Sequence, residues 1–181
     1  MENRIVIGMS YDPWHNLALE EILFEQQAEQ QGVTLYLWQN ENTVVIGKHQ
    51  NAWLECRMAL LEEEGGKLAR RSSGGGAVFH DLGNLNFTFL ARQSDYDLKR
   101  QMRVIGNAVG YFGIETEMTG RNDLVVKKSG AKFSGNAFRL SNAVGMQHGT
   151  ILVQTDMDKL GRYLSPAKEK LMAKGVKSVR A

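Results

Sequence analysis

Apolar residues recur along this chain at two spacings, which separate the expected helices from the expected strands. Asp12-Pro13 is typical of a helix start, because Asp caps free N–H groups and Pro suits the first helical position. Leu17, Ile22 and Phe24 lie on the broad apolar face that follows, which predicts a helix to about residue 30. Apolar residues at helical spacing over 97–112 predict a second long helix.

Alternating apolar residues between turn signals predict a series of strands. These strands cover 33–38, 43–47, 67–71, 77–80, 85–90, 114–118, 123–127, 131–138 and 147–153. The polar turn 39–42 joins the first two, 81–84 and 127–130 form further turns, and helices are expected at 51–65, 156–163 and 166–173. Many turn-linked strands with helices grouped between them favour an α+β fold with a mostly antiparallel mixed sheet and flanking helices.

The composition is that of an ordinary globular protein of 181 residues, with 43% hydrophobic and 23% charged residues. This length fits one domain. A net charge of +2 is too small to suggest bulk nucleic-acid binding, and no stretch approaches a membrane span, so neither partner is expected. The single cysteine and the early acid in the N-terminal sequence, which argues against a signal peptide, favour a cytoplasmic protein. We expect a monomer.

The segment 70–84 is the most informative part of the chain, because Arg70 and Arg71 precede two serines and the glycines 74–76. Such a loop can take positive φ and bring its backbone close to a bulky ligand. Exposed N–H groups and guanidinium groups bind phosphate or carboxylate. The motif has no P-loop ending and leads into a strand, so arginine and lysine must supply the positive field. A flexible surface turn is the alternative interpretation.

A second cluster, Lys132-Phe133-Ser134-Gly135-Asn136-Ala137-Phe138, places a lysine in an expected strand before a Ser-Gly pair. This lysine either reaches an anion or is an ordinary edge-strand lysine. Asp123 is expected to orient Lys132, to bind magnesium or to cap a turn. His80 and His148 have no visible nucleophile partner, so we expect structural or ligand-binding roles. Cys56 is interpreted as a buried hydrophobe, and the histidines and cysteine show no metal-ligand spacing.

Together these motifs strongly resemble the lipoate–protein ligases, a family of the biotin/lipoate ligase superfamily. The segments 10–14, 43–47, 120–126 and 148–150 are similar to the same family, and the likeness runs along essentially the whole chain. The resemblance implies a fold like those of class II aminoacyl-tRNA synthetases and biotin ligases. It also implies that residues 1–181 are one catalytic large domain, with its C-terminal portion and a small accessory domain missing.

The resemblance further implies the reaction and the site. Such ligases activate lipoate with ATP to lipoyl-AMP, then pass the lipoyl group to a lysine of carrier domains in 2-oxoacid dehydrogenase complexes or of the glycine-cleavage carrier protein. Magnesium would screen the triphosphate, although no metal ligands are assigned. Lys132 would be the catalytic residue. Carried over by similarity, the ATP-binding residues are Arg71, Gly76, Ala77, Val78, Phe79 and Lys132. The lipoate-binding residues are Lys132, Arg71, Ser73, Gly75, His80 and Asn84, with Asp123 and His148 as further candidates.

Two other functions fit the same residues. An ATP-independent octanoyl or lipoyl transferase would need a reactive cysteine, for which Cys56 is the only candidate, and its apolar neighbours argue against a thiolate. A non-catalytic module that binds lipoate or a carrier domain would fit a short chain. Because the glycine loop and Lys132 carry the main hypothesis, we expect Gly75 and Lys132 to lie on the same side of the molecule.

Overall fold

Each of the two long helices begins directly after an aspartate that caps it. The computed structural model describes residues 2–120 and 122–164. Helix α1 (Pro13–Gln26) follows Asp12, whose carboxylate accepts hydrogen bonds from two backbone N–H groups of the first turn, and it continues into a 3-10 helix, η1 (Gln27–Glu29). Helix α4 (Leu98–Gly110) follows Asp97, whose carboxylate accepts a hydrogen bond from the backbone N–H of Arg100. Both expected helices are therefore confirmed.

Ten strands and five shorter helices make up the rest of the described chain. The strands are β1 (Arg4–Ile7), β2 (Val33–Trp38), β3 (Thr43–Ile46), β4 (Lys67–Arg70), β5 (Ala77–His80), β6 (Asn84–Arg92), β7 (Thr116–Thr119), β8 (Asp123–Val126), β9 (Lys132–Leu140) and β10 (Val144–Leu152). The other short helices are α2 (Ala52–Glu55), α3 (Met58–Glu63), η2 (Gln93–Asp95) and α5 (Met157–Tyr163).

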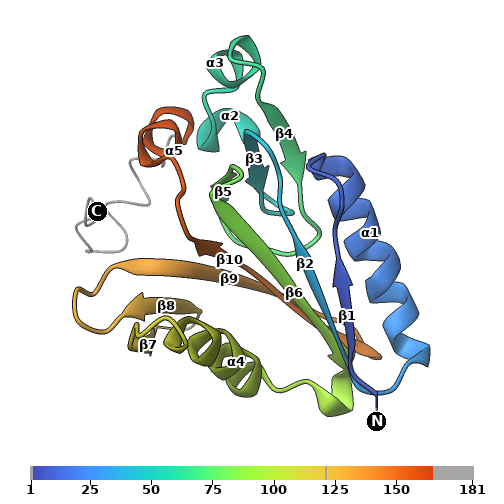
Figure 1. The fold of residues 1–181 in the computed structure, drawn as a ribbon. Coiled ribbons are helices and arrows are strands. Elements are labelled where there is room, and N and C mark those ends of the chain that lie inside the picture. The colour runs from blue at the N-terminus through green and yellow to red at the C-terminus, as the bar shows by residue number, and fades with distance from the viewer. Residues whose placement is uncertain (1, 121, 165–181) are drawn as a thin grey trace.

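The strands form two sheets (Figure 1). The large sheet has seven strands in the order β1-β2-β6-β10-β9-β8-β7, and the small sheet has three in the order β4-β3-β5. Only the β1–β2 and β3–β4 pairs are parallel. The expected α+β class with a mostly antiparallel mixed sheet is confirmed.

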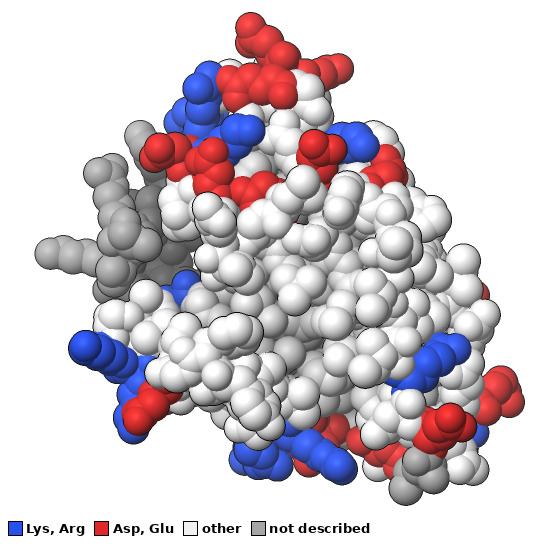
Figure 2. All heavy atoms as spheres, viewed as in Figure 1, with Lys and Arg blue, Asp and Glu red and all other residues white. Residues whose placement is uncertain are grey.

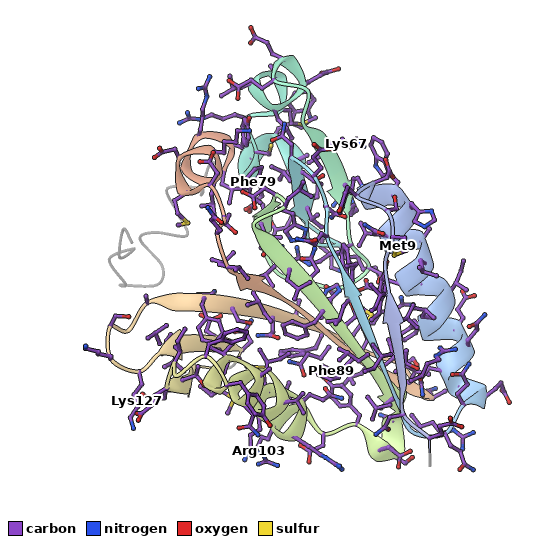
Figure 3. The ribbon with its side chains drawn as sticks, viewed as in Figure 1. Met9, Lys67, Phe79, Phe89, Arg103 and Lys127 are labelled. Carbon is purple, nitrogen blue, oxygen red and sulfur yellow. The ribbon has the colours of Figure 1, made fainter. Side chains whose placement is uncertain are left out.

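Each face of the large sheet has its own hydrophobic core. On one face, α1 packs on Tyr36, Leu90 and Met146. On the other face, α4 packs on Phe87 and Phe89, and Figure 3 labels Phe89 in this layer. The small sheet has a third core, in which Val44 and Phe79 pack against α2, α3 and α5. These three cores place the small sheet beside one end of the large one (Figure 1).

Several expectations are corrected. The helix expected over 51–65 is two helices, because Cys56 is extended between them and pairs with Leu164. The turn 39–42 does join two strands, but it sends β2 and β3 into different sheets. Strand β1 was not predicted, since it is short and its Ile5 and Ile7 are exposed. The helix expected at 166–173 lies outside the described residues.

Charged side chains of both signs gather toward the rim of the face seen in Figure 2, and few lie in its middle. One of these charged residues, Lys67, also connects two elements of the fold. Its ammonium group lies 2.9 Å from the Asp12 carboxylate and above the Trp14 ring, and so ties β4 to the start of α1 (Figure 3). None of the helices in the described part of the chain is long and apolar enough to cross a membrane.

Candidate active site

A cavity of about 340 Å³ lies where α1, the small sheet and the large sheet meet. Gly75 and Lys132 both line it, although they are far apart in sequence and belong to different parts of the fold. The expectation that these two residues lie on the same side of the molecule is therefore confirmed. Of the other predicted site residues, Arg71, Gly76, Ala77, Val78, His80, Asp123 and His148 also line the cavity.

The glycine loop is held by the side chain of Arg71, which is only 8% exposed. Its Nη2 atom donates to the carbonyl oxygens of Gly74 at 2.8 Å and Gly76 at 2.9 Å, and its Nη1 atom donates to that of Val45 at 3.2 Å. Burial lowers the pKa of Arg71 to about 10, against an opposing effect of the nearby Glu20 carboxylate. The guanidinium group thus binds the loop itself, and a direct contact of Arg71 with nucleotide stays a prediction.

Glycine is required at two positions where this loop is formed. Gly75 has a φ of 99°, and a Cβ atom there would lie 2.7 Å from Arg71 Nη2. At Gly47, at the end of β3, a Cβ atom would lie 2.1 Å from the Gly75 carbonyl oxygen. The backbone of β3 therefore approaches the loop more closely than any side chain would permit.

Strand β5 follows the loop and is an edge strand, paired with β3 and with no second neighbour in the small sheet as described. Ala77 and Val78 at its start line the cavity, so backbone there is available to a ligand. The side chain of Phe79, which is labelled beside α5 in Figure 3, points elsewhere: it is 1% exposed and packs on Tyr163 with ring centroids 5.4 Å apart. Any contact of Phe79 with nucleotide would therefore come through its backbone.

Lys132 and Asp123 form an ion pair that lines the cavity. The ammonium group of Lys132 lies 2.8 Å from Asp123 Oδ1, and its side chain is 53% exposed. A Cβ atom on Gly135 would lie 3.2 Å from the Lys132 nitrogen, so glycine leaves space for this lysine. Of the roles considered for Asp123, the structure supports the orientation of Lys132.

The cavity does not contain a set of metal ligands. Among the described residues that line it, Asp123 is the only one with a carboxylate, and this carboxylate is already paired with Lys132. Over residues 2–120 and 122–164 there is no group of three or more His, Cys, Asp or Glu side chains that could hold a metal ion. The described residues therefore do not fit a magnesium ion held by protein ligands alone.

A buried hydrogen-bond chain connects α1 to the glycine loop. His148 Nδ1 lies 2.9 Å from Glu20 Oε1, and its Nε2 lies 2.6 Å from Ser73 Oγ, which also accepts from Arg71 Nε at 3.1 Å. Because a carboxylate only accepts, His148 must donate from Nδ1, and Ser73 can then donate to Nε2. This chain fixes the orientation of His148, which lines the cavity, and Ser73 itself is buried behind it.

Glu20 is one of the residues around the site that the sequence analysis missed. Its carboxylate is 2% exposed and also accepts from Thr88 Oγ1 at 2.5 Å. Glu20 follows Leu17 by three positions and precedes Leu23 by three, so it lies within the apolar face of α1. An acid at such a position is the signal that would have pointed to a buried partner.

His80 lines the cavity, and Asn84 lies behind its wall. Burial, with smaller effects of Arg71 and His148, lowers the pKa of His80 to about 3, so this imidazole is neutral. Asn84 is fully buried and does not line the cavity, but its Nδ2 donates to Asn86 Oδ1 at 2.9 Å, and Asn86 does line it. Asn84 therefore orients a lining residue.

Cys56 is not part of this cavity. It is 3% exposed among apolar side chains between α2 and α3, and burial raises the pKa of its thiol. The interpretation as a buried hydrophobe is confirmed, and the environment is the opposite of one that stabilises a thiolate.

The comparisons with known proteins agree with this geometry. Residues 12–181 match the family model for the lipoyl protein ligase A/B catalytic domain. The structure of P. falciparum LipL1 in complex with lipoate is 34% identical with a TM-score of 0.85, covering 92% of this chain and 52% of that one. A lipoate-protein ligase A bound with ATP is 25% identical with a TM-score of 0.82, covering 99% of this chain and 80% of that one.

A third similar structure comes from Thermoplasma acidophilum and is described as a bi-partite lipoate protein ligase and its E2 lipoyl domain. It is 28% identical with a TM-score of 0.80, covering 97% of this chain and 72% of that one. The present chain thus spans about half the length of the P. falciparum protein and about three quarters of the other two. Since the family model matches nearly the whole sequence and the folds agree, the chain belongs to the lipoyl protein ligase A/B catalytic-domain family.

Proposed function

We propose that this chain is the catalytic large domain of an ATP-dependent lipoate ligase, which forms lipoyl-AMP and transfers the lipoyl group to a carrier-domain lysine. The observation that carries the proposal is the joining of the glycine loop and Lys132 in one cavity. Its family membership and the lipoate and ATP bound by similar structures support the same reading. Because those relatives are longer, the activity of residues 1–181 alone is part of the proposal.

In the first step a carboxylate oxygen of lipoate attacks the α-phosphorus of ATP. The new bond joins that oxygen to phosphorus, the bond from the α-phosphorus to the bridging oxygen breaks, and pyrophosphate leaves with the electron pair. Both reactants are anionic, so a cation near the reacting oxygens lowers the barrier. Among the described residues that line the cavity, Lys132 is the partly exposed cation, and Asp123 holds its ammonium group in place.

The glycine loop, residues 74–76, positions the nucleotide, while the positive charge comes from Lys132. Arg71 holds the carbonyl oxygens of Gly74 and Gly76, which fixes the loop against β3 before any ligand binds. A preformed backbone surface at Ala77 and Val78 can then bind the nucleotide without paying for loop ordering. Ser73 supports the loop from within through Arg71 and His148.

In the second step the amine of the carrier lysine attacks the carbonyl carbon of lipoyl-AMP. An amide bond forms, the bond from the carbonyl carbon to the phosphate oxygen breaks, and AMP leaves while the amine loses a proton to solvent. No protein nucleophile is required, which agrees with the burial of Cys56 outside the cavity. The carriers proposed are lipoyl domains of 2-oxoacid dehydrogenase complexes and the glycine-cleavage carrier protein, in a cytoplasmic setting.

The test is to incubate the chain with ATP, magnesium, lipoate and an apo lipoyl domain, and to weigh that domain by mass spectrometry. The expected result is the mass of one lipoyl group, with release of pyrophosphate. An unmodified domain and no pyrophosphate, beside a working full-length ligase, would contradict the proposal. Binding of lipoyl-AMP without turnover would instead identify a non-catalytic module.

Two lysine variants test whether Lys132 takes part in the first step. Lys132→Ala is expected to lower the rate of pyrophosphate release about 100-fold or more, because one group that stabilises developing charge is worth that much. Lys127→Ala is the matched control: this lysine is 62% exposed, pairs with Glu115 and does not line the cavity. Equal rates for the two variants would remove Lys132 from the mechanism.

A further inference from the structure

One face of the large sheet is apolar and only partly covered. Val6 packs into the core beneath α1, so the alternation of a strand turns Ile5 and Ile7 to the opposite face, where α4 lies. These two isoleucines are 67% and 66% exposed. We call this surface the open face and define it by six aliphatic residues on the α4 side of the sheet: Ile5, Ile7, Leu35, Leu37, Leu85 and Ile151.

The strand register makes the open face continuous. In the β1–β2 pair, Ile5 lies opposite Leu35 and Ile7 opposite Leu37. Both leucines are half-buried and pack against the edge of the α4 core. In the β2–β6 pair, Leu37 lies opposite Phe87, which is fully buried in that core. The apolar surface therefore runs without a break from the sheet edge at β1 to the part of the face that α4 covers.

Charge is nearly absent from the strands that carry the open face. The sequences of β1, β2, β6 and β10 contain two Lys, Arg, Asp or Glu residues, Arg4 at the start of β1 and Arg92 at the end of β6. Figure 2 shows few charged side chains in the middle of the view, where Figure 1 draws β1, β2 and β6. A contiguous exposed apolar surface with charges only around it is typical of an interaction site.

The size of the open face fits one helix. From β1 to β10 there are three strand spacings, about 14 Å, and the stretch of β6 from Leu85 to Phe89 spans about 13 Å. An α-helix is about 10–12 Å wide, so a helical stretch of about nine residues covers this area. A folded partner with an interface of standard size needs about 800 Å² on each side, which is several times the area of the open face.

The similar ligase structures are a source for such a helix. Each of the three is longer than this chain, although it matches nearly all of it. These proteins therefore contain additional polypeptide that has no counterpart among the 181 residues. A helix from that polypeptide, lying beside α4, would extend the helical layer that already covers the neighbouring strands.

We propose that the open face binds one amphipathic helix from the additional polypeptide of the longer ligases. The helix presents aliphatic, uncharged side chains to Ile5, Ile7 and Leu37. The inference rests on the fold and the family and not on the ligase activity. The cavity is lined by Leu17 of α1 and by Trp38, on the other side of the large sheet, so covering the open face leaves the cavity accessible.

Thiol labelling measures whether the open face is covered. The native Cys56 is 3% exposed, so it gives little background. Ile7→Cys places a thiol on the open face, and Leu54→Cys is the matched control, because Leu54 is 60% exposed and lies on α2 beside the small sheet. The probe is the part of lipoate-protein ligase A that has no counterpart in this chain, added as a separate polypeptide. We expect it to slow the labelling of Ile7→Cys about tenfold and that of Leu54→Cys less than about twofold.

Calorimetry with the same polypeptide measures the affinity. Ile5→Gln is expected to raise its dissociation constant about tenfold, because most of an isoleucine side chain is no longer buried against the helix. Leu54→Gln is expected to leave it unchanged. Ile5 and Leu54 are both largely exposed, so neither change affects a core residue, and thermal melting shows that each variant is folded.

The outcomes separate this inference from the proposed function. Equal labelling of Ile7→Cys with and without the polypeptide overturns the inference, and so does equal slowing of Ile7→Cys and Leu54→Cys. Slow labelling of Ile7→Cys in the chain alone also overturns it, and sedimentation then distinguishes a second copy from another part of this chain as the cover. Lipoyl transfer is measured on the same samples: transfer by a protein whose open face stays uncovered leaves the proposed function intact, and a covered face without transfer contradicts the proposed function only.

Discussion

Alanine substitutions at two neighbouring glycines, Gly74 and Gly75, test how Arg71 holds the glycine loop. Gly75 has a φ of 99°, and its missing Cβ would lie 2.7 Å from Arg71 Nη2. Gly74 has no atom within 4 Å of its missing Cβ. Alanine at Gly75 must therefore strain the backbone and displace the guanidinium group, whereas alanine at Gly74 requires neither change.

The magnitude follows from the two effects at Gly75. A left-handed backbone conformation costs an alanine roughly 1–2 kcal/mol. Arg71 Nη2 must move by several tenths of an ångström, which weakens its bonds to Gly74 and Gly76, and a buried hydrogen bond of a charged group is worth roughly 1.5–3 kcal/mol. We expect Gly75→Ala to lower the free energy of unfolding by about 3 kcal/mol and Gly74→Ala by less than about 0.5 kcal/mol.

Urea denaturation followed by tryptophan fluorescence measures both values, and calorimetric titration with ATP reports the loop directly. Gly75→Ala should weaken ATP binding along with stability, while Gly74→Ala should bind as the wild type does. If the two variants unfold at the same urea concentration and bind ATP equally, Arg71 does not hold the loop in the way described.

Three further predictions concern buried groups. Glu20→Gln should lower the free energy of unfolding by about 2 kcal/mol in urea melts, because the charge-assisted bond to His148 is lost. The control is Glu21→Gln, at a partly exposed position, which should lower it by less than about 1 kcal/mol. Equal effects of the two variants would contradict the buried hydrogen-bond chain. The pKa of His80 is lower in the folded state than in the unfolded state, so the unfolded state binds more protons at acid pH. As the pH falls from about 6.5 to 5, the free energy of unfolding should therefore decrease by about 2 kcal/mol. If urea melts of His80→Phe show the same dependence of this free energy on pH, the prediction is refuted. Cys56 should react with a thiol reagent only after urea unfolding, and Cys56→Ser should keep full lipoyl transfer; rapid labelling of the folded protein or loss of transfer would revive a covalent route.

The difference between prediction and structure is clearest at Cys56. The apolar spacing around it is helical, and a single helix over 51–65 is a reasonable expectation. In the fold, Cys56 is extended and pairs with Leu164, and the N–H of Arg57 donates to the Tyr163 carbonyl oxygen at 2.9 Å. A contact with a segment about 100 residues later overrides the local preference.

The two cations of the site show the same difference. That Arg71 and Lys132 belong to an anion-binding region follows from their neighbours in the sequence. Only the fold shows that the guanidinium group turns back onto the loop carbonyls while the ammonium group, paired with Asp123, faces the cavity. Charge can be read from a residue type, but the direction of a long side chain depends on the packing around it.

The sequence by itself determined the elements whose causes are local: the capped starts of α1 and α4, the alternating strands, and the glycine loop followed by a lysine-bearing strand. Tertiary structure decided which groups meet. Glu20 and His148 are 128 residues apart, and Asn40 and His80 are 40 apart, yet each pair is joined by a hydrogen bond between buried side chains that holds an imidazole in place. Periodicity and capping act over a few residues, whereas hydrogen bonds between buried groups depend on the packing of two sheets and a helix around one cavity.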